Sequence, residues 1–501
     1  MALKRSVEGM NVLVFMTDQE RAIQHFPKGW ARKNLPGLER LRRNGLSFTR
    51  AFCDACMCSP SRATLMTGYF PAQHGVKWTL EQDIVSPQAE MPLDLPNIAT
   101  VMAAAGYSTP YKGKFHLTKP ANPSGKWLPE DVDRYGFQRW NPPDAGANQD
   151  PSEFGGGDAD NDGRFMHCDG SVKAGDEGVL AYLRSPASKQ GRFCLVVSLV
   201  NPHDVLAYPN TAFDNGYNKS WLIGDIGLPE TVDEDLSTKP AVQRQFLALS
   251  NAGLGKLDKV GQRNYLNFYG NLIKSSDNYL VEVLDTLEEQ GLLENTLIIR
   301  TADHGEMGMT HGGQRQKNFN FYEETLCVPL IYSNPRLYKK PFVSEAMVAH
   351  VDFLPTLASL FDAPLPARAN WEGVDYSQIV LDPNARPTQR YIVFTYDDYE
   401  SGQPNPPYPG PRNHIISIRE ERYKLAKYYD ANVSGGPYEW EMYDLETDPN
   451  EWRNIAYKGH KRTKKQQQEY ERLRKQLALV ERERLQPLAA RQTAKSGSGS
   501  V

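Results

Sequence analysis

Five consecutive residues, Cys58-Ser59-Pro60-Ser61-Arg62, combine a thiol, a rigid turn, hydroxyls and a guanidinium. Proline fixes φ near the value of a first helical turn, so we expect a helix to begin here. The backbone amides and the dipole of a helix N-terminus favour negative charge, and Arg62 stands one turn further on. The pattern therefore predicts an anion-binding site around Cys58. The alternative is a buried structural cysteine beside an ordinary helix cap.

Two pairs of polar residues could supply metal ligands near such a site. Asp18-Gln19 follows the apolar run 11–16, and Asp303-His304 follows the strand-like run 296–299. Open α/β sheets place their ligand sites beyond the carboxyl ends of the strands. Hard oxygen and imidazole ligands can together hold one divalent cation, although a single aspartate after a strand is usually a helix cap.

The elements around these residues predict an α/β fold. Apolar runs alternate with amphipathic helical patterns, the runs at 11–16, 193–200 and 296–299 and the helical patterns at 35–45, 96–105 and 280–287. This alternation predicts a large, mixed but mostly parallel sheet sandwiched by helices. Residues 140–175 are rich in Gly, Asp, Asn and Pro, which predicts a long loop.

The pattern changes after about residue 380. Short alternating stretches predict a small antiparallel sheet, at 391–395, 415–419, 423–427 and 440–445. A charged helix is predicted at 461–490, and the Ser-Gly repeat at 496–500 is typical of a flexible tail. We therefore divide the chain into a catalytic α/β domain at 1–380, an antiparallel β subdomain at 381–460, and a helix with a tail at 461–501.

The composition restricts the possible partners and compartment. The 57 basic and 61 acidic residues of the 501 leave a formal charge of -4, which gives no reason to expect nucleic acid or an anionic membrane as a partner. No apolar stretch approaches the length of a membrane span, and the run 12–16 is too short for a signal peptide. We expect a cytoplasmic protein, although a chain without its native leader would look the same.

The six cysteines do not form the pattern of a disulfide framework, because three of them crowd into 53–58 and the others are scattered. Cys53-x-x-Cys56 could be half of a zinc site or a redox pair, but no second pair completes it. The run 158–163 is similar to the start of a calcium-binding EF-hand loop, but it lacks the flanking helices and has Asp169 in place of the final glutamate. We expect a polar loop there.

Residues 58–68 read C-x-P-S-R-x-x-L-x-T-G, which resembles the signature of the type I sulfatases, within the alkaline phosphatase superfamily. The resemblance implies an alkaline phosphatase-like fold and hydrolysis of sulfate monoesters. It also implies that a formylglycine-generating or equivalent maturation enzyme oxidises Cys58 to formylglycine, whose hydrated aldehyde is the nucleophile. Arg62 and a metal ion would hold this hydrate, and Asp303 would orient or deprotonate its attacking hydroxyl.

By the same resemblance, one divalent cation is bound by Asp18, Gln19, Asp303, His304 and the modified residue 58. Calcium is the usual ion of the family. Many members have Asp-Asp and Asp-Asn where this chain has Asp-Gln and Asp-His, and the pairs present here resemble choline sulfatases and phosphonate monoester hydrolases. Manganese is the alternative, because the set has fewer carboxylates and includes an imidazole.

The resemblance assigns roles to four further side chains. Lys114 and His116 form the family's Lys-x-His, in which the lysine binds a sulfate oxygen and the histidine takes a proton from the second hydroxyl of formylglycine. In an extended segment both side chains would face the site. His203 would donate a hydrogen bond or proton to the leaving-group oxygen, and Lys317 would do the same while it clamps sulfate.

Two neighbours of Lys317 leave its assignment open. The spacing from His311 to Lys317 is one residue longer than the family pattern, so Arg315 is a competitor for the role. We expect His311 to support the site from behind rather than to contact the substrate.

The substrate is expected to be a small-molecule or sugar sulfate ester, with aryl, choline and sugar sulfates all open. The segments 140–190 and 396–400 are expected to line the mouth of the site. An apolar stripe at helical spacing predicts a homo-oligomer, a dimer or tetramer, with packing on its own subunit as the alternative; it consists of Tyr470, Leu473, Leu477 and Val480.

Two other functions compete with sulfate ester hydrolysis. The first is a phosphonate monoester or phosphodiester hydrolase of the same superfamily, which the Asp-Gln and Asp-His pairs favour. Lys114-x-His116 argues against it, because that subgroup resembles Tyr-x-Thr at this position. The second is an inactive protein that binds sulfated glycans, which would need a lost ligand or nucleophile, and none is missing.

Overall fold

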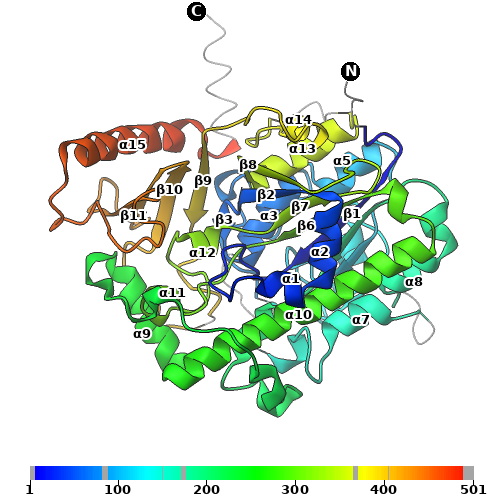
Figure 1. Ribbon diagram of the computed structural model, residues 1–501, viewed down its shortest axis with the longest axis horizontal. Coiled ribbons are helices and arrows are strands. Elements are labelled where there is room, and N and C mark those ends of the chain that lie inside the picture. The colour runs from blue at the N-terminus through cyan, green and yellow to red at the C-terminus, as the bar shows by residue number, and fades with distance from the viewer. Residues whose placement is uncertain are drawn as a thin grey trace, which may run out of the picture.

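The computed structural model describes residues 6–81, 88–148, 150–170, 176–364, 370–403 and 405–488. A large sheet lies between two layers of helices, and a second sheet with the long helix α15 (Lys464–Glu483) lies at one side (Figure 1). The tail predicted at 496–500 is outside the described residues.

The large sheet has seven strands in the order β4-β5-β1-β6-β7-β2-β8. Their bounds are β4 (Tyr111–Gly113), β5 (Cys194–Ser198), β1 (Asn11–Thr17), β6 (Thr296–Ala302), β7 (Leu330–Ser333), β2 (Gly45–Phe52) and β8 (Phe342–Ala349). Neighbouring strands pair in parallel except at β7, which is antiparallel to both β6 and β2. The mostly parallel sheet that the sequence predicts is confirmed.

The central strand β1 is buried on both faces and separates two hydrophobic cores. Leu13 and Phe15 face the core formed with α2 (Pro36–Arg43), α8 (Val179–Arg184) and α10 (Lys259–Glu289). Val12 and Val14 face the opposite core, formed with α3 (Cys58–Thr67), α5 (Ile98–Ala104) and α13 (Phe353–Leu360). Figure 1 shows α13 and α5 on one side of the sheet and α10 and α8 on the other. Period-two alternation places successive side chains in different cores.

The second sheet has five strands in the order β12-β11-β10-β9-β3. Four are the antiparallel strands predicted from the sequence, β9 (Tyr391–Tyr396), β10 (His414–Glu420), β11 (Tyr423–Tyr429) and β12 (Glu439–Asp444). The fifth, β3 (Ala55–Cys56), pairs in parallel with β9. The segment directly before Cys58 is therefore fastened to the second sheet, which the sequence did not predict.

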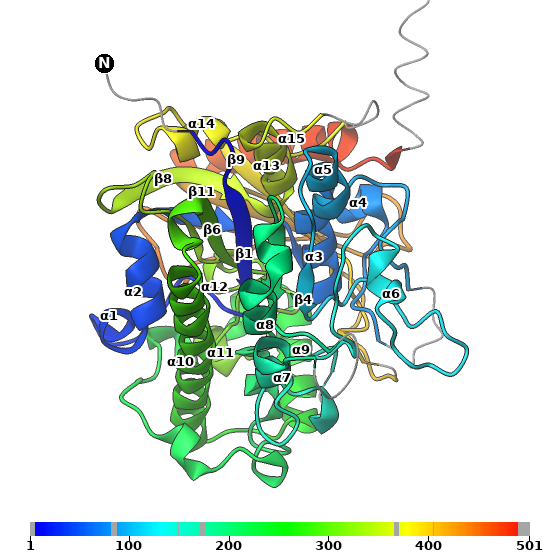
Figure 2. The ribbon, with the colours of Figure 1, turned by 90° about the vertical axis from the view of Figure 1, so that its right-hand side faces the viewer.

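The remaining α-helices are short apart from α9 and are drawn in Figures 1 and 2. They are α1 (Trp30–Asn34), α4 (Pro71–His74), α6 (Glu130–Asp133), α7 (Asn161–His167), α9 (Ala241–Gly253), α11 (Thr310–Gly313), α12 (Glu323–Leu326) and α14 (Ser377–Leu381). Among the described residues, none of the helices combines the length and the apolar character that crossing a bilayer demands.

Helix α15 covers the second sheet of its own chain. Tyr470, Leu473 and Leu477 are buried in one core with side chains of β10, β11 and β12, among them Ile418 and Leu425. The expectation that this stripe joins subunits is therefore wrong, because the stripe is already covered by the same chain. A homo-oligomer stays a prediction, without this surface to support it.

We expect Leu473→Ala to lower the free energy of unfolding by about 2–5 kcal/mol, the usual cost of removing a fully buried leucine. Leu473 is 0% exposed, whereas Leu479 on the same helix is 38% exposed. Leu479→Ala is therefore the matched control, with a change of less than about 0.5 kcal/mol. Urea unfolding followed by circular dichroism measures both, and equal losses in the two variants would contradict the packing of α15.

Candidate active site

Helix α3 begins at Cys58, as the sequence predicts, and Gly68 ends it in a left-handed conformation with φ 72°. Every residue from Cys58 to Thr67 is buried. Asp18 directly follows β1, and Asp303 directly follows β6, so both carboxylates lie at the carboxyl edge of the sheet, where the N-terminus of α3 meets them. The parallel topology thus brings together three segments that are far apart in the sequence.

Four predicted metal ligands meet at this edge. One ligand atom from each of Asp18, Cys58, Asp303 and His304 lies within 4.8 Å of the others, and all four residues are buried. His304 Nε2 is 3.2 Å from Cys58 Sγ, and Cys58 Sγ is 3.7 Å from Asp18 Oδ1. Two carboxylates and an imidazole around residue 58 are a donor set that fits a divalent cation.

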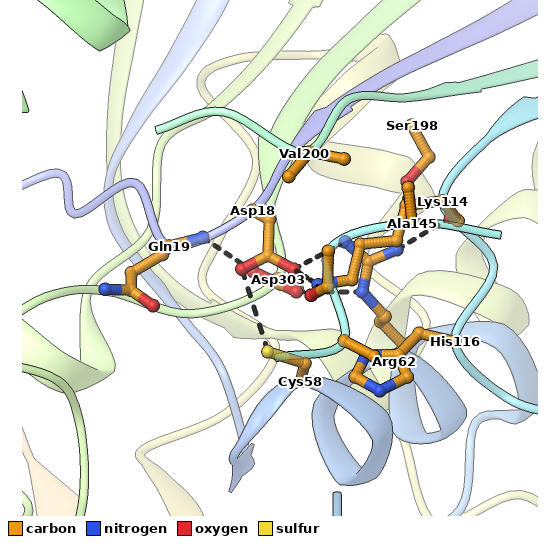
Figure 3. A network of polar contacts seen from close by, with 12 residues as sticks. Asp18, Gln19, Cys58, Arg62, Lys114, His116, Ala145, Ser198, Val200 and Asp303 are labelled. Atoms are coloured by element: carbon orange, nitrogen blue, oxygen red, sulfur yellow. Dashed lines mark hydrogen bonds and ion pairs between the residues drawn. The ribbon is translucent and has the colours of Figure 1, made fainter. Parts of the chain in front are cut away.

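The guanidinium of Arg62 lies between the two carboxylates (Figure 3). Its Nη2 is 3.0 Å from Asp18 Oδ2, and its Nε is 2.9 Å from Asp303 Oδ2. Burial by itself would raise the pKa of Asp18, but the positive charges of Lys114 and Arg62 hold that pKa well below its usual range. Asp18 is therefore ionised at neutral pH. The sequence predicts that Arg62 helps to hold residue 58. In the structure it binds the two carboxylates that surround this residue.

The side chain of Gln19 is turned away from the four grouped ligands (Figure 3). Its Oε1 accepts a hydrogen bond from Lys317 Nζ at 2.6 Å, and its Nε2 donates to Glu306 Oε2 at 2.6 Å. Only its backbone reaches the ligands, where the amide donates to Asp303 Oδ1 at 3.0 Å. The geometry makes Gln19 a support for Lys317. Glu306 was missed, although it stands three residues after Asp303.

Lys114 and His116 both lie beside Arg62 (Figure 3). Lys114 Nζ is 2.5 Å from Asp18 Oδ2 and also donates to the carbonyl of Gly146. His116 Nε2 is 2.6 Å from the Leu80 carbonyl, and its buried Nδ1 has no hydrogen-bond partner. The predicted extended segment is wrong, because β4 ends at Gly113 and His116 has φ 55°. The histidine reaches the site from a turn.

His203 and Lys317 line a pocket of about 830 Å³ together with Cys58. Burial, and then the charge of Lys114, hold the pKa of His203 well below its usual range. The imidazole is therefore neutral at neutral pH, so it can donate a hydrogen bond to a leaving-group oxygen rather than a full proton. The competitor Arg315 donates instead to the backbone carbonyls of Ser250 and Gly255. The geometry favours Lys317.

The pocket walls come from several segments. The predicted mouth segments contribute Ala147, Asn148, Asp150 and Glu400. Helix α9, with Phe246 and Leu249, and the residues 401–403 and 405–409 were not predicted as parts of the wall. Neither carries a motif, and α9 approaches Cys58 only through the tertiary fold.

Three other sequence signals lie outside the site. His311 stacks on Tyr322 at 3.6 Å and its Nδ1 is 2.6 Å from Glu234 Oε2, so it packs between elements instead of backing the nucleophile. The Asp162 carboxylate of the run 158–163 accepts hydrogen bonds from the amides of Val200 and Asn201, so it anchors the chain after β5.

The remaining signal is the buried Cys53 and Cys56 pair. Their sulfur atoms are 4.0 Å apart, and both cysteines are free. In the described part of the chain, neither cysteine belongs to a group that could hold a metal ion.

Cys58 as a thiol is poorly suited to attack an ester. Burial, and then the charge of Asp18, raise the pKa of the Cys58 thiol to about 11. Because the thiolate is the nucleophilic form, a thiol with this pKa is almost entirely inactive near neutral pH. Residue 58 therefore lies where a nucleophile could act, but its protonated thiol is not reactive.

Comparison with known families identifies the family to which the chain belongs. Residues 10–363 match the sulfatase family model, and residues 312–482 match the model described as N-sulphoglucosamine sulphohydrolase, C-terminal. The chain belongs to the sulfatase family. Membership implies in general a metal ion and a formylglycine residue, and the grouped ligands and Cys58 of this sulfatase fit both.

Named relatives of this sulfatase act on different esters. Ulvan-active sulfatase of Formosa agariphila is 26% identical over 451 residues, which cover 89% of this chain and 77% of the relative. Choline-sulfatase of Rhizobium meliloti is 25% identical over 461 residues, with 89% and 82% covered. Arylsulfatase A of Homo sapiens is 27% identical over 406 residues, with 78% and 69% covered. These relatives show that the sulfatase is a sulfuric ester hydrolase.

Solved structures share its fold. A 2-O GAG sulfatase superposes with a TM-score of 0.66 at 21% identity, covering 94% of this chain and 91% of that one. Phosphonate monoester hydrolase of Silicibacter pomeroyi superposes with a TM-score of 0.65 at 20% identity, covering 95% and 96%. Both confirm the predicted mixed α/β fold, with a large, mostly parallel sheet and a second, smaller sheet.

We expect Asp303→Asn to weaken divalent cation binding by more than the roughly 10–100-fold typical of a lost outer-shell partner. The reason is that Asp303 contributes a buried carboxylate to the grouped ligands. Metal content after dialysis and titration with calcium or manganese measure the effect. Asp214→Asn, at an exposed position, is the control. An Asp303→Asn protein that keeps the affinity of the parent would place the ion elsewhere.

Proposed function

We propose that residue 58, oxidised from cysteine to formylglycine, is the nucleophile with which this sulfatase cleaves sulfate monoesters. The observation that carries the proposal is the position of Cys58. It stands at the first residue of α3, beside two carboxylates and an imidazole, and at the inner end of the pocket.

We propose calcium as the ion, with manganese as the alternative, held by Asp18, Asp303, His304 and residue 58. When bound, the cation supplies positive charge that polarises a sulfate oxygen and the attacking hydroxyl. All other groups that we propose to take part in the reaction are side chains of the protein. Arg62 keeps both carboxylates in place through its hydrogen bonds at 2.9–3.0 Å.

The remaining work is divided between His203 and Lys317, which line the pocket, and Lys114 and His116, which are not among its lining residues. Lys317 and His203 donate hydrogen bonds to sulfate or to the leaving-group oxygen, because both line the pocket with residue 58. Lys114, paired with Asp18, adds positive charge behind the sulfate position. His116 has a buried Nδ1 without a partner, which leaves it free to take the proton when the aldehyde is regenerated.

The natural alcohol is open among aryl, choline and sugar types, and the relatives carry names of all three kinds. Hydrolysis of phosphonate monoesters is the second candidate, and the Asp-Gln and Asp-His pairs favour it. Lys114 and His116 beside Arg62 favour sulfate. Rates on matched sulfate monoester and phosphodiester substrates separate the two. A binding protein without activity is disfavoured, because the nucleophile position and its ligands are all present.

Oxidation of Cys58 predicts a measurable change of mass together with activity. Mass spectrometry of the intact protein should show the lower mass expected when an aldehyde replaces the thiol group, and this protein should hydrolyse 4-nitrophenyl sulfate. Cys58→Ala should abolish turnover and keep the circular dichroism spectrum. The matched control is Cys168→Ala, at a cysteine outside the pocket. Near-normal activity of Cys58→Ala would refute the nucleophile.

Two donors at the leaving group predict a dependence on the alcohol. His203→Ala or Lys317→Ala should slow alkyl sulfates about 10²–10⁴-fold more than 4-nitrophenyl sulfate, since a phenolate of low pKa leaves without help. His116→Ala should slow all esters alike, because it acts after the alcohol has left. Steady-state kcat/KM and kcat for both ester types measure this. The assignment fails if His203→Ala shows no such difference while His116→Ala does.

A further inference from the structure

The charged groups of the pocket are unevenly distributed. Among its described lining residues, Lys317 is the one lysine or arginine, and its charge acts on Cys58 and His203 at the inner end. The rest of the lining carries three carboxyl side chains, which are Glu81, Asp150 and Glu400. The positive charge of Lys317 therefore lies where the sulfate group would bind. The rest of the described lining, which would surround the alcohol part, carries only acidic side chains among its ionisable residues apart from His203, Cys58 and Tyr408.

Glu81 is the innermost of the three carboxyl groups. It is 6% exposed, and it is close enough to Cys58 for their charges to interact. Its Oε2 accepts a hydrogen bond from Asn148 Nδ2 at 3.3 Å, which fixes the carboxyl at the pocket wall. Burial, and then the neighbouring Glu153, raise the pKa of Glu81 to about 9. A cation in contact with this carboxyl group would stabilise its ionised form and lower its pKa.

A second row of carboxylates stands behind Glu81. Glu153 accepts hydrogen bonds from the amides of Ala147 and Asn148 and so stays next to the pocket wall. Asp398 is fully buried and accepts the amide of Thr79, which also lines the pocket. A further carboxylate or sulfate on the alcohol part would oppose the ionisation of these carboxyl groups, whereas a cation would favour it and be attracted by the resulting negative charge.

Another part of the pocket lining is apolar and aromatic. Phe246, Leu249 and Leu254 come from α9 and the residue after it, and Tyr408 comes from the stretch that follows β9. Carboxylates combined with aromatic faces are the groups that proteins use to bind an organic ammonium. A polyanionic sugar chain would instead need arginine or lysine along its path.

We propose that the pocket takes sulfate esters of alcohols that carry a cationic nitrogen, and that the Glu81 carboxyl is the specificity-determining group that faces this nitrogen. The proposal rests on the sulfate ester hydrolysis proposed above, since it concerns the alcohol part of the same substrate. Asp150 and Glu400 add to the attraction nearer the mouth.

The test uses three aryl sulfates that differ only beyond a methylene group, so that their phenols leave with similar ease. They are 4-(aminomethyl)phenyl, 4-(hydroxymethyl)phenyl and 4-(carboxymethyl)phenyl sulfate. With the matured enzyme, kcat/KM should fall in that order, and the cationic ester should exceed the neutral one on the order of tenfold or more. In Glu81→Gln this ratio should fall toward one. Glu282→Gln, at a carboxylate paired with His167 outside the pocket, should keep the parent's ratio.

Binding measured without turnover separates this proposal from the reaction itself. Cys58→Ala protein is titrated calorimetrically with the same three esters, and the cationic ester should bind most tightly, with the preference lost when Glu81→Gln is added. Equal affinities and equal kcat/KM values, or a preference for the carboxymethyl ester, would overturn the proposal. Absence of turnover of all three esters by matured enzyme, with the binding order kept, would refute the hydrolytic function and not the specificity of the pocket.

Discussion

The buried guanidinium of Arg62 is the interaction on which the site depends. It binds groups at the ends of four strands, because Asp18 follows β1, Asp303 follows β6, Lys114 follows β4, and Ser198 ends β5. Two carboxylates out of water cost several kcal/mol each unless they are paired and hydrogen-bonded. Arg62 meets this demand from the second turn of α3. The same contacts fix where the helix begins, and thereby where residue 58 stands.

The second sheet contributes to that placement from the other side. β3 pairs with β9 immediately before α3, so the chain that enters the helix is held by the C-terminal part of the protein. Helix α15 in turn buries the outer face of the second sheet. His311 and Tyr322 stack between the loop after β6 and α12 and are bonded to buried carboxylates. The active site is thus clamped between elements that are more than 300 residues apart in the sequence.

Elements that are encoded by a few neighbouring residues could be predicted from the sequence. Apolar runs in the sequence predict strands such as β1 and β6, and residues 58–68 form a continuous motif. The orientation and the partners of side chains that depend on the tertiary fold could not be predicted. The orientation of His116 follows from its positive φ. The side-chain amide of Gln19 is hydrogen-bonded to Lys317 and Glu306. The spacing of residues in the sequence shows neither feature. The stripe of α15 was found, but an apolar stripe does not say what covers it. Glu81 and Phe246 carry no motif at all.

The geometry separates what all sulfate esters share from what distinguishes them. The inner end gathers Lys317, His203 and residue 58. These are the groups that we propose contact the sulfate and the oxygen next to it, which every ester of this class has. The outer walls come from irregular segments such as the stretch after β9, and from α9, which is not bonded to the metal ligands. Changes in these walls alter the alcohol that fits without disturbing the contacts of Arg62.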